Sequence, residues 1–133
     1  MARMIFVNLP VRDLAASRRF YGGLGFAVNE MVSDDRTACV VVSGTICVVL
    51  LDHERFAAAA PRPVADARTT TQVLLCLSAG SRAEVDGFAA DALAGGGALV
   101  RDVQDDGTMY ARAVADPDGH VWEILHVGGC PPG

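Results

Sequence analysis

The chain has 133 residues, a length typical of one compact domain, and 51% of them are hydrophobic, which supplies enough apolar surface for a core. Its 16 acidic residues exceed its 11 basic ones, all arginines, and the formal net charge is −5. This balance argues against a nucleic acid partner, because a surface that follows phosphates needs clustered basic residues. We therefore expect one domain over residues 1–133 that does not bind nucleic acid.

Neither a membrane span nor a signal peptide is indicated. The most apolar stretch, residues 40–51, is shorter than the ~20 residues that a helix needs to cross a bilayer. The N-terminus lacks a charged segment followed by an apolar run and a cleavage site. We expect a cytoplasmic protein without membrane contact, with reduced cysteines. Cys39, Cys47 and Cys76 are expected in the core, and Cys130 in a tail.

The first part of the chain, residues 4–52, has the pattern of one strand, one helix and three further strands. Apolar residues alternate over residues 4–11, as in a strand with two different faces. Asp13 then precedes a helical pattern over residues 14–21, which a glycine-rich stretch ends. Three strands are expected over residues 26–32, 37–42 and 45–51.

The same order of elements returns after a linker. Residues 53–71 show no sustained apolar period apart from a possible short helix. Ser81 to Glu84 then forms a capping-box sequence that opens a second helix. Residues 72–127 again predict β-α-β-β-β, and residues 128–133 a flexible tail. The strands of this second module are expected over residues 72–78, 98–101, 108–114 and 119–127.

A tandem β-α-β-β-β repeat predicts an α+β fold. Each module has one helix, which covers only one face of its sheet. The other face must therefore line a cleft or be covered by something else. The simplest arrangement curls two mixed sheets around a shared cleft with the helices outside. We expect a ligand site in this cleft.

Two motifs bracket the repeat. The first is LPVRDL at residues 9–14, followed by FY at 20–21 and LGF at 24–26, and the second is DPDGHVWEI at 116–124. In this order they resemble the vicinal oxygen chelate superfamily, which includes glyoxalase I, extradiol dioxygenases, and fosfomycin and bleomycin resistance proteins. The Met-Tyr pair at 109–110 also looks like that of bacterial predicted lactoylglutathione lyases. The resemblance covers residues 4–126 and implies the glyoxalase/bleomycin resistance fold.

Enzymes of this superfamily hold a divalent metal (Zn, Ni, Fe or Mn) with His, Gln or Glu from the first and last strands of each module. The resemblance places these positions at Phe6, Val48 or Val49, Leu74 and Glu123. Only Glu123 matches a family ligand, and one carboxylate does not make a metal site. We therefore expect no cofactor, with one divalent metal bound by Glu123 as the alternative.

Strand alternation predicts which side chains face the cleft. It separates Glu123 from His120 and His126, and it pairs Arg112 with Glu123 if the turn at 116–119 has no bulge. The pair is either a structural ion pair or a ligand anchor, with Tyr110 adding a hydroxyl. The predicted catalytic residues are Glu123 and Tyr110. The predicted ligand-binding residues are Phe6, Asn8, Gln72, Leu74, Tyr110 and Arg112.

Three functions follow from these residues. The missing metal ligands favour a metal-free protein that binds a small organic molecule in the inter-module cleft. The resemblance alone supports a metal-dependent lactoylglutathione lyase-like or extradiol dioxygenase-like enzyme. The third is metal-free acid–base chemistry by Glu123 with Tyr110 and Arg112. We also expect a homodimer, with the cleft formed within one chain or between swapped chains.

Overall fold

The computed structural model describes residues 2–128. Asp13 caps the first helix as predicted, because its side chain accepts a hydrogen bond from the Ala16 N–H at 3.1 Å. The strand predicted over residues 26–32 is shorter, since Asn29 instead caps a 3-10 helix, η1 (Glu30–Val32). The first module contains β1 (Ile5–Val11), α1 (Leu14–Gly23), β2 (Ala27–Val28), β3 (Thr37–Val41) and β4 (Ile46–Asp52).

The second module repeats this order with one addition. The Ser81 hydroxyl caps its helix by accepting from the Glu84 N–H at 3.1 Å, as predicted. The Glu84 carboxylate accepts from the Gly80 N–H, one residue earlier than in a standard capping box. The sequence did not predict β7, which is two residues long and has no apolar alternation. The elements are β5 (Leu74–Ser78), α3 (Arg82–Ala94), β6 (Ala98–Leu99), β7 (Gln104–Asp105), β8 (Met109–Ala115) and β9 (Val121–Val127).

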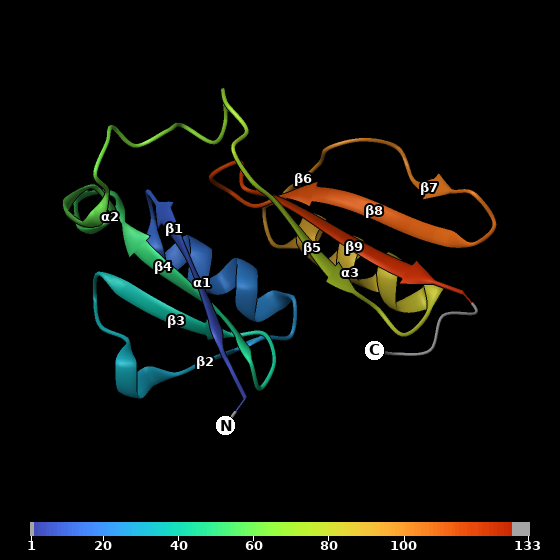
Figure 1. Ribbon diagram of the computed structural model, residues 1–133, viewed down its shortest axis with the longest axis horizontal. Coiled ribbons are helices and arrows are strands. Elements are labelled where there is room, and N and C mark those ends of the chain that lie inside the picture. Colours follow the sequence, from blue (N-terminus) through green and yellow to red (C-terminus); the bar gives the residue numbers. More distant parts are fainter. Residues whose placement is uncertain (1, 129–133) are drawn as a thin grey trace.

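The predicted linker begins with a short helix, α2 (His53–Ala59), which the Asp52 side chain caps by accepting from the Arg55 N–H at 2.7 Å. Residues 60–73 contain no further helix or strand. They cross from the first module to the second along one end of both sheets (Figure 1). We call residues 60–73 the connecting segment.

Both modules build the same mixed sheet. The strand order is β1-β4-β3-β2 in the first and β5-β9-β8-β6 in the second, where β7 also pairs with β8. In each module the first and last strands are parallel and the remaining pairs are antiparallel. The tandem arrangement predicted from the sequence is therefore present.

The helices α1 and α3 contact each other and lie on the same side of the two sheets (Figure 1). One continuous core fills the space between helices and sheets across both modules. The opposite face of each sheet, which we call the open face, exposes Phe6 on β1 (53%) and Leu74 on β5 (58%). The largest fully buried side chains include Phe20, Tyr21, Val11, Val40, Val48, Leu50, Val85 and Val114.

The turn between β8 and β9 contains three residues, one more than the predicted register assumed. The Asp116 N–H donates to the His120 carbonyl at 2.9 Å, and Gly119 has φ = 93°. A three-residue hairpin loop of this kind ends on a residue in the left-handed region, which glycine adopts readily. The extra residue shifts the pairing by one, so Ala113 and not Arg112 lies opposite Glu123.

Within residues 2–128, no helix combines the length and apolar character needed to cross a membrane. Cys39 and Cys47 are buried as predicted, whereas the prediction that Cys76 lies in the core is wrong, because β5 exposes that face. Gly128 donates its N–H to the Thr108 carbonyl at 2.8 Å. The rest of the predicted tail, including Cys130, lies outside the described residues.

Candidate ligand-binding site

A pocket of about 220 Å³ lies between the two modules, beneath the connecting segment. We call it the inter-module pocket. Asn8 on β1 and Gln72 just before β5 both line it, so the structure brings together two of the residues predicted to bind a ligand. Its walls are mostly apolar: Leu9, Pro10, Phe56, Val64, Ala65, Ala67, Val73, Leu75 and Val121.

A few polar groups face this apolar pocket. Asn8 donates from Nδ2 to the Phe6 carbonyl at 3.2 Å, which leaves its Oδ1 free to accept. Within residues 2–128, the Gln72 side chain is in no hydrogen bond, so it is available to a ligand. His120 Nε2 lies 2.8 Å from the Pro10 carbonyl. Because a carbonyl only accepts, this nitrogen carries a proton.

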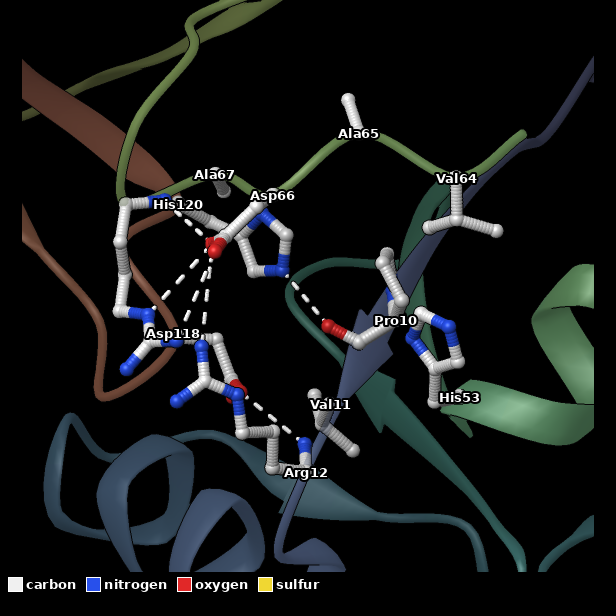
Figure 2. A pocket seen from close by; sticks show the side chains of 11 residues that line it. Pro10, Val11, Arg12, His53, Val64, Ala65, Asp66, Ala67, Asp118 and His120 are labelled. Atoms are coloured by element: carbon white, nitrogen blue, oxygen red, sulfur yellow. Dashed lines mark hydrogen bonds and ion pairs between the residues drawn. The ribbon is translucent and has the colours of Figure 1, made fainter.

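A second, polar recess of about 170 Å³ adjoins the pocket (Figure 2). We call it the arginine recess, after Arg12 and Arg68. The side chains that distinguish it are Arg12, His53, Asp66, Arg68 and Asp118. His120 and Pro10, together with Val64, Ala65 and Ala67 of the connecting segment, line both spaces.

Asp66 lies between the two arginines. Its Oδ1 is 3.7 Å from Arg12 Nη2 and 3.4 Å from Arg68 Nε, and it accepts from the Arg68 backbone N–H at 3.0 Å. The Arg68 N–H and guanidinium, with a smaller contribution from Arg12, lower the pKa of Asp66 from its usual value. The recess therefore presents donors that favour a carboxylate.

The two sequence motifs meet in a buried hydrogen-bond network that joins the modules. The Tyr21 hydroxyl of α1 donates to Asp116 Oδ2 at 2.7 Å and accepts from Trp122 Nε1 at 2.9 Å. Asp118 accepts from the Arg12 N–H at 3.0 Å and from the Ser17 hydroxyl at 3.4 Å. We call these residues the inter-module clamp, which fixes one wall of the site.

Burial changes the protonation chemistry of the clamp. It raises the pKa of Asp116, although the neighbouring His120 and the Tyr21 hydroxyl oppose that shift. Burial together with the charge of Asp116 also raises the pKa of Tyr21 well above its usual value. Tyr21 therefore stays protonated and serves as a hydrogen-bond donor.

The predicted Arg112–Glu123 pair is wrong. Arg112 lies opposite Ile124, on the sheet face that α3 covers, with its Nε 2.9 Å from Asp86 Oδ1. Tyr110 also points toward α3, where its hydroxyl donates to Asp86 at 2.6 Å. The three-residue turn causes both errors, because a shift of one residue moves side chains to the opposite face. The structure thus separates Tyr110 and Arg112 from Glu123.

Glu123 lies on the open face of the second sheet, beside Cys76 on β5. Its carboxylate accepts a hydrogen bond from Arg101. Arg101 follows β6, and the sequence did not identify it as a partner because the segment from 100 to 108 lacks regular alternation. The pair neutralises a carboxylate whose side chain is only 20% exposed.

The residues present do not fit the divalent metal that the resemblance implies. Phe6 and Leu74 lie on the open faces of the first strands, and Val49, opposite Asn8, is also apolar. Glu123 is the only oxygen donor at the matched positions, and Arg101 occupies it. Among residues 2–128, no three His, Cys, Asp or Glu side chains gather as a metal site. Catalytic zinc sites and non-haem iron sites typically use three protein ligands.

Sequence reasoning missed several residues of the site. It did not assign His120, Arg12, Asp66 or Arg68 to any site. The segment that carries Asp66 and Arg68 has no periodicity to place its side chains. A usable signal was its length, because a segment of that size must pack over some surface of a compact domain.

Comparisons with known proteins agree with the fold. A family model, the bleomycin resistance protein-like N-terminal domain, matches residues 3–44. Protein SA1046 from S. aureus is 25% identical, with 95% of this chain and 94% of that chain covered and a TM-score of 0.80. A glyoxalase-related enzyme from Fulvimarina pelagi is also 25% identical, with coverage of 100% and 94% and a TM-score of 0.83.

A glyoxalase/bleomycin resistance protein/dioxygenase family enzyme from Burkholderia phytofirmans PsJN is 23% identical, with coverage of 95% and 99% and a TM-score of 0.78. No curated protein matches the sequence. The resemblance to the vicinal oxygen chelate superfamily is thus confirmed. The chain has the α+β glyoxalase/bleomycin resistance fold, as predicted. This fold hosts several chemistries, so the function must be argued from the site.

Proposed function

We propose that the protein binds a small organic molecule in the inter-module pocket without using a metal. The observation that carries this proposal is the pocket itself: apolar walls from both modules surround the two amides of Asn8 and Gln72. Ligand sites are typically concave and mainly apolar, with a few polar groups that fix orientation. Glu123 is the only side chain at the matched positions that could bind a metal, and it is paired with Arg101. This supports the metal-free part of the proposal.

The test is an NMR titration with a mixture of neutral, cationic and anionic aromatic compounds. We expect at least one compound to shift the backbone amide signals of Asn8, Gln72 and Val121. Thr71→Trp should weaken that binding by tenfold or more, because Thr71 is exposed and lines the pocket. Thr69→Trp is the matched control, since Thr69 is also exposed but does not line it.

Two results would contradict the proposal. One is that no compound in the mixture shifts the pocket signals. The other is that Thr71→Trp and Thr69→Trp bind as tightly as the natural sequence, which would place the binding site elsewhere.

We also propose that the protein forms a homodimer that covers the open sheet faces. On these faces Phe6 on β1 and Leu74 on β5 remain more than half exposed in one chain. Large apolar side chains exposed on a sheet face are typical of interaction sites. Size-exclusion chromatography with light scattering should give a dimer, and Phe6→Glu should give a monomer. Met31→Glu, at a position 95% exposed on η1, is the control, and a monomeric natural protein would refute this part.

A further inference from the structure

The arginine recess has more positive than accessible negative charge. Two guanidiniums, of Arg12 and Arg68, share the single carboxylate of Asp66. Asp118, the other carboxylate at the recess, is 8% exposed and already accepts from the Arg12 N–H and the Ser17 hydroxyl. If the Asp66 side chain turned away, both guanidiniums would face the recess without a partner there.

Turning the Asp66 side chain away breaks its hydrogen bond from the Arg68 N–H at 3.0 Å and its ion pairs with two exposed guanidiniums. The Asp66 side chain is 46% exposed, and the side chains of Arg12 and Arg68 are 50% and 52% exposed. Ion pairs at such positions stabilise a protein only slightly. The main chain is held independently, since the Asp66 carbonyl accepts from the N–H groups of Thr69 at 3.0 Å and Thr70 at 2.9 Å. The side chain therefore moves without displacing the connecting segment.

The recess shares part of its wall with the inter-module pocket. His120 and Pro10 line both spaces, as do Ala65 and Ala67 of the connecting segment. In Figure 2 the Asp66 side chain extends from the connecting segment toward Arg12 and Arg68. A molecule that extends past this shared wall would place an apolar body in the pocket and a polar end beside Arg12 and Arg68.

We propose that the ligand is an amphipathic carboxylic acid, whose carboxylate replaces that of Asp66 between Arg12 and Arg68 while its apolar part fills the inter-module pocket. Asp66 then acts as an internal competitor that occupies the anion site when no ligand is bound. Paired guanidiniums suit a carboxylate because they offer several charge-assisted donors to two oxygens. The inference rests on the proposed function and narrows it to one ligand class.

The test compares phenylacetate with phenylacetamide by isothermal titration calorimetry on the full chain. We expect phenylacetate to bind at least tenfold more tightly. Arg12→Gln and Arg68→Gln should each weaken phenylacetate binding by about tenfold and leave phenylacetamide unchanged. Asp66→Asn should tighten phenylacetate binding severalfold, because it removes the competitor. Arg62→Gln and Asp102→Asn carry the same charge changes outside the recess and should have little effect.

The sign of the Asp66→Asn effect separates competition from a structural role. If Asp66 only held the segment in place, its loss would weaken both compounds, and that result overturns the inference. Equal affinities for phenylacetate and phenylacetamide also overturn it. So does the absence of binding by both compounds when other compounds of the NMR mixture bind the pocket. In each of these cases the proposed function stands. If no compound binds the pocket at all, the proposed function is contradicted as well.

Discussion

Tyr21→Phe removes a single oxygen atom from the centre of the inter-module clamp. That hydroxyl donates to Asp116 at 2.7 Å and accepts from the Trp122 indole at 2.9 Å, and Tyr21 is fully buried. Without it, a buried carboxylate loses its side-chain donor and a buried indole N–H loses its acceptor. The ring itself keeps its edge contacts with Phe20 and Trp122.

The expected loss is large for one atom. A hydrogen bond to a charged group contributes about 1.5–3 kcal/mol, and an unsatisfied buried N–H costs about 1–3 kcal/mol. These effects overlap at one oxygen, so we expect the free energy of unfolding to fall by about 2–4 kcal/mol. For a chain of this size, a loss of about 3 kcal/mol lowers the Tm by roughly 10 °C.

The sign of the pH dependence provides a second readout. Burial raises the pKa of Asp116, so the folded state holds this proton more tightly than the unfolded state does. This contribution to stability is therefore present at low pH and is lost as the pH rises through the raised value. Tyr21→Phe removes a group that lowers this pKa, so the loss with rising pH should become larger. Asp116→Asn should abolish this part of the dependence.

Urea unfolding followed by fluorescence measures both effects, because Trp122 is the only tryptophan and lies in the clamp. Tyr110→Phe is the matched control, since that hydroxyl donates to Asp86 at an exposed site and should cost less than about 1 kcal/mol. A Tyr21→Phe variant no less stable than Tyr110→Phe, with an unchanged pH profile, would refute the clamp.

Three further predictions concern close packing and metal content. Gly119→Ala should lower the free energy of unfolding by about 1–3 kcal/mol in urea titrations, because a Cβ there would lie 2.8 Å from the Ala67 carbonyl and φ is positive. Gly97→Ala should cost at least as much, since its Cβ would lie 2.5 Å from the Ala115 carbonyl oxygen and 2.8 Å from the Phe20 ring; unchanged stability would count against either. Protein purified without chelators should contain less than one equivalent of divalent metal by elemental analysis. One tightly bound ion per chain that is lost in Glu123→Ala would return metal chemistry to first place.

The fold was predictable because the strongest local signals agreed with the global arrangement. Asp13 and Ser81 begin the two long helices as expected, since their side chains satisfy free N–H groups of the first turn. The apolar alternation in β1 and β9 has a period that only a strand can use. These signals depend on neighbours along the chain, and a single sequence contains them in full.

The site was predictable only in part, because it depends on one residue of turn length and on a segment without periodicity. Reading the turn as two residues placed Arg112 opposite Glu123, whereas Gly119 in the left-handed region adds the third residue. Asn8 and Gln72 were identified because they lie on or beside the matching first strands. The contacts of Asp66 follow from the path of the connecting segment across both modules, which no local pattern encodes.

The turn and the connecting segment also link stability to binding. Gly119 allows the Ala67 backbone to pack against the turn, while Asp118 in the same turn holds the end of β1 through the Arg12 N–H. One short loop thus positions the wall of the pocket, the arginine of the recess and the segment that carries Asp66. Because the pocket and recess exist only when the two modules are packed together, a ligand that fills them should bind the folded chain alone and stabilise it by mass action. The contacts of this turn thus contribute both to the stability of the folded chain and to the shape of the binding site.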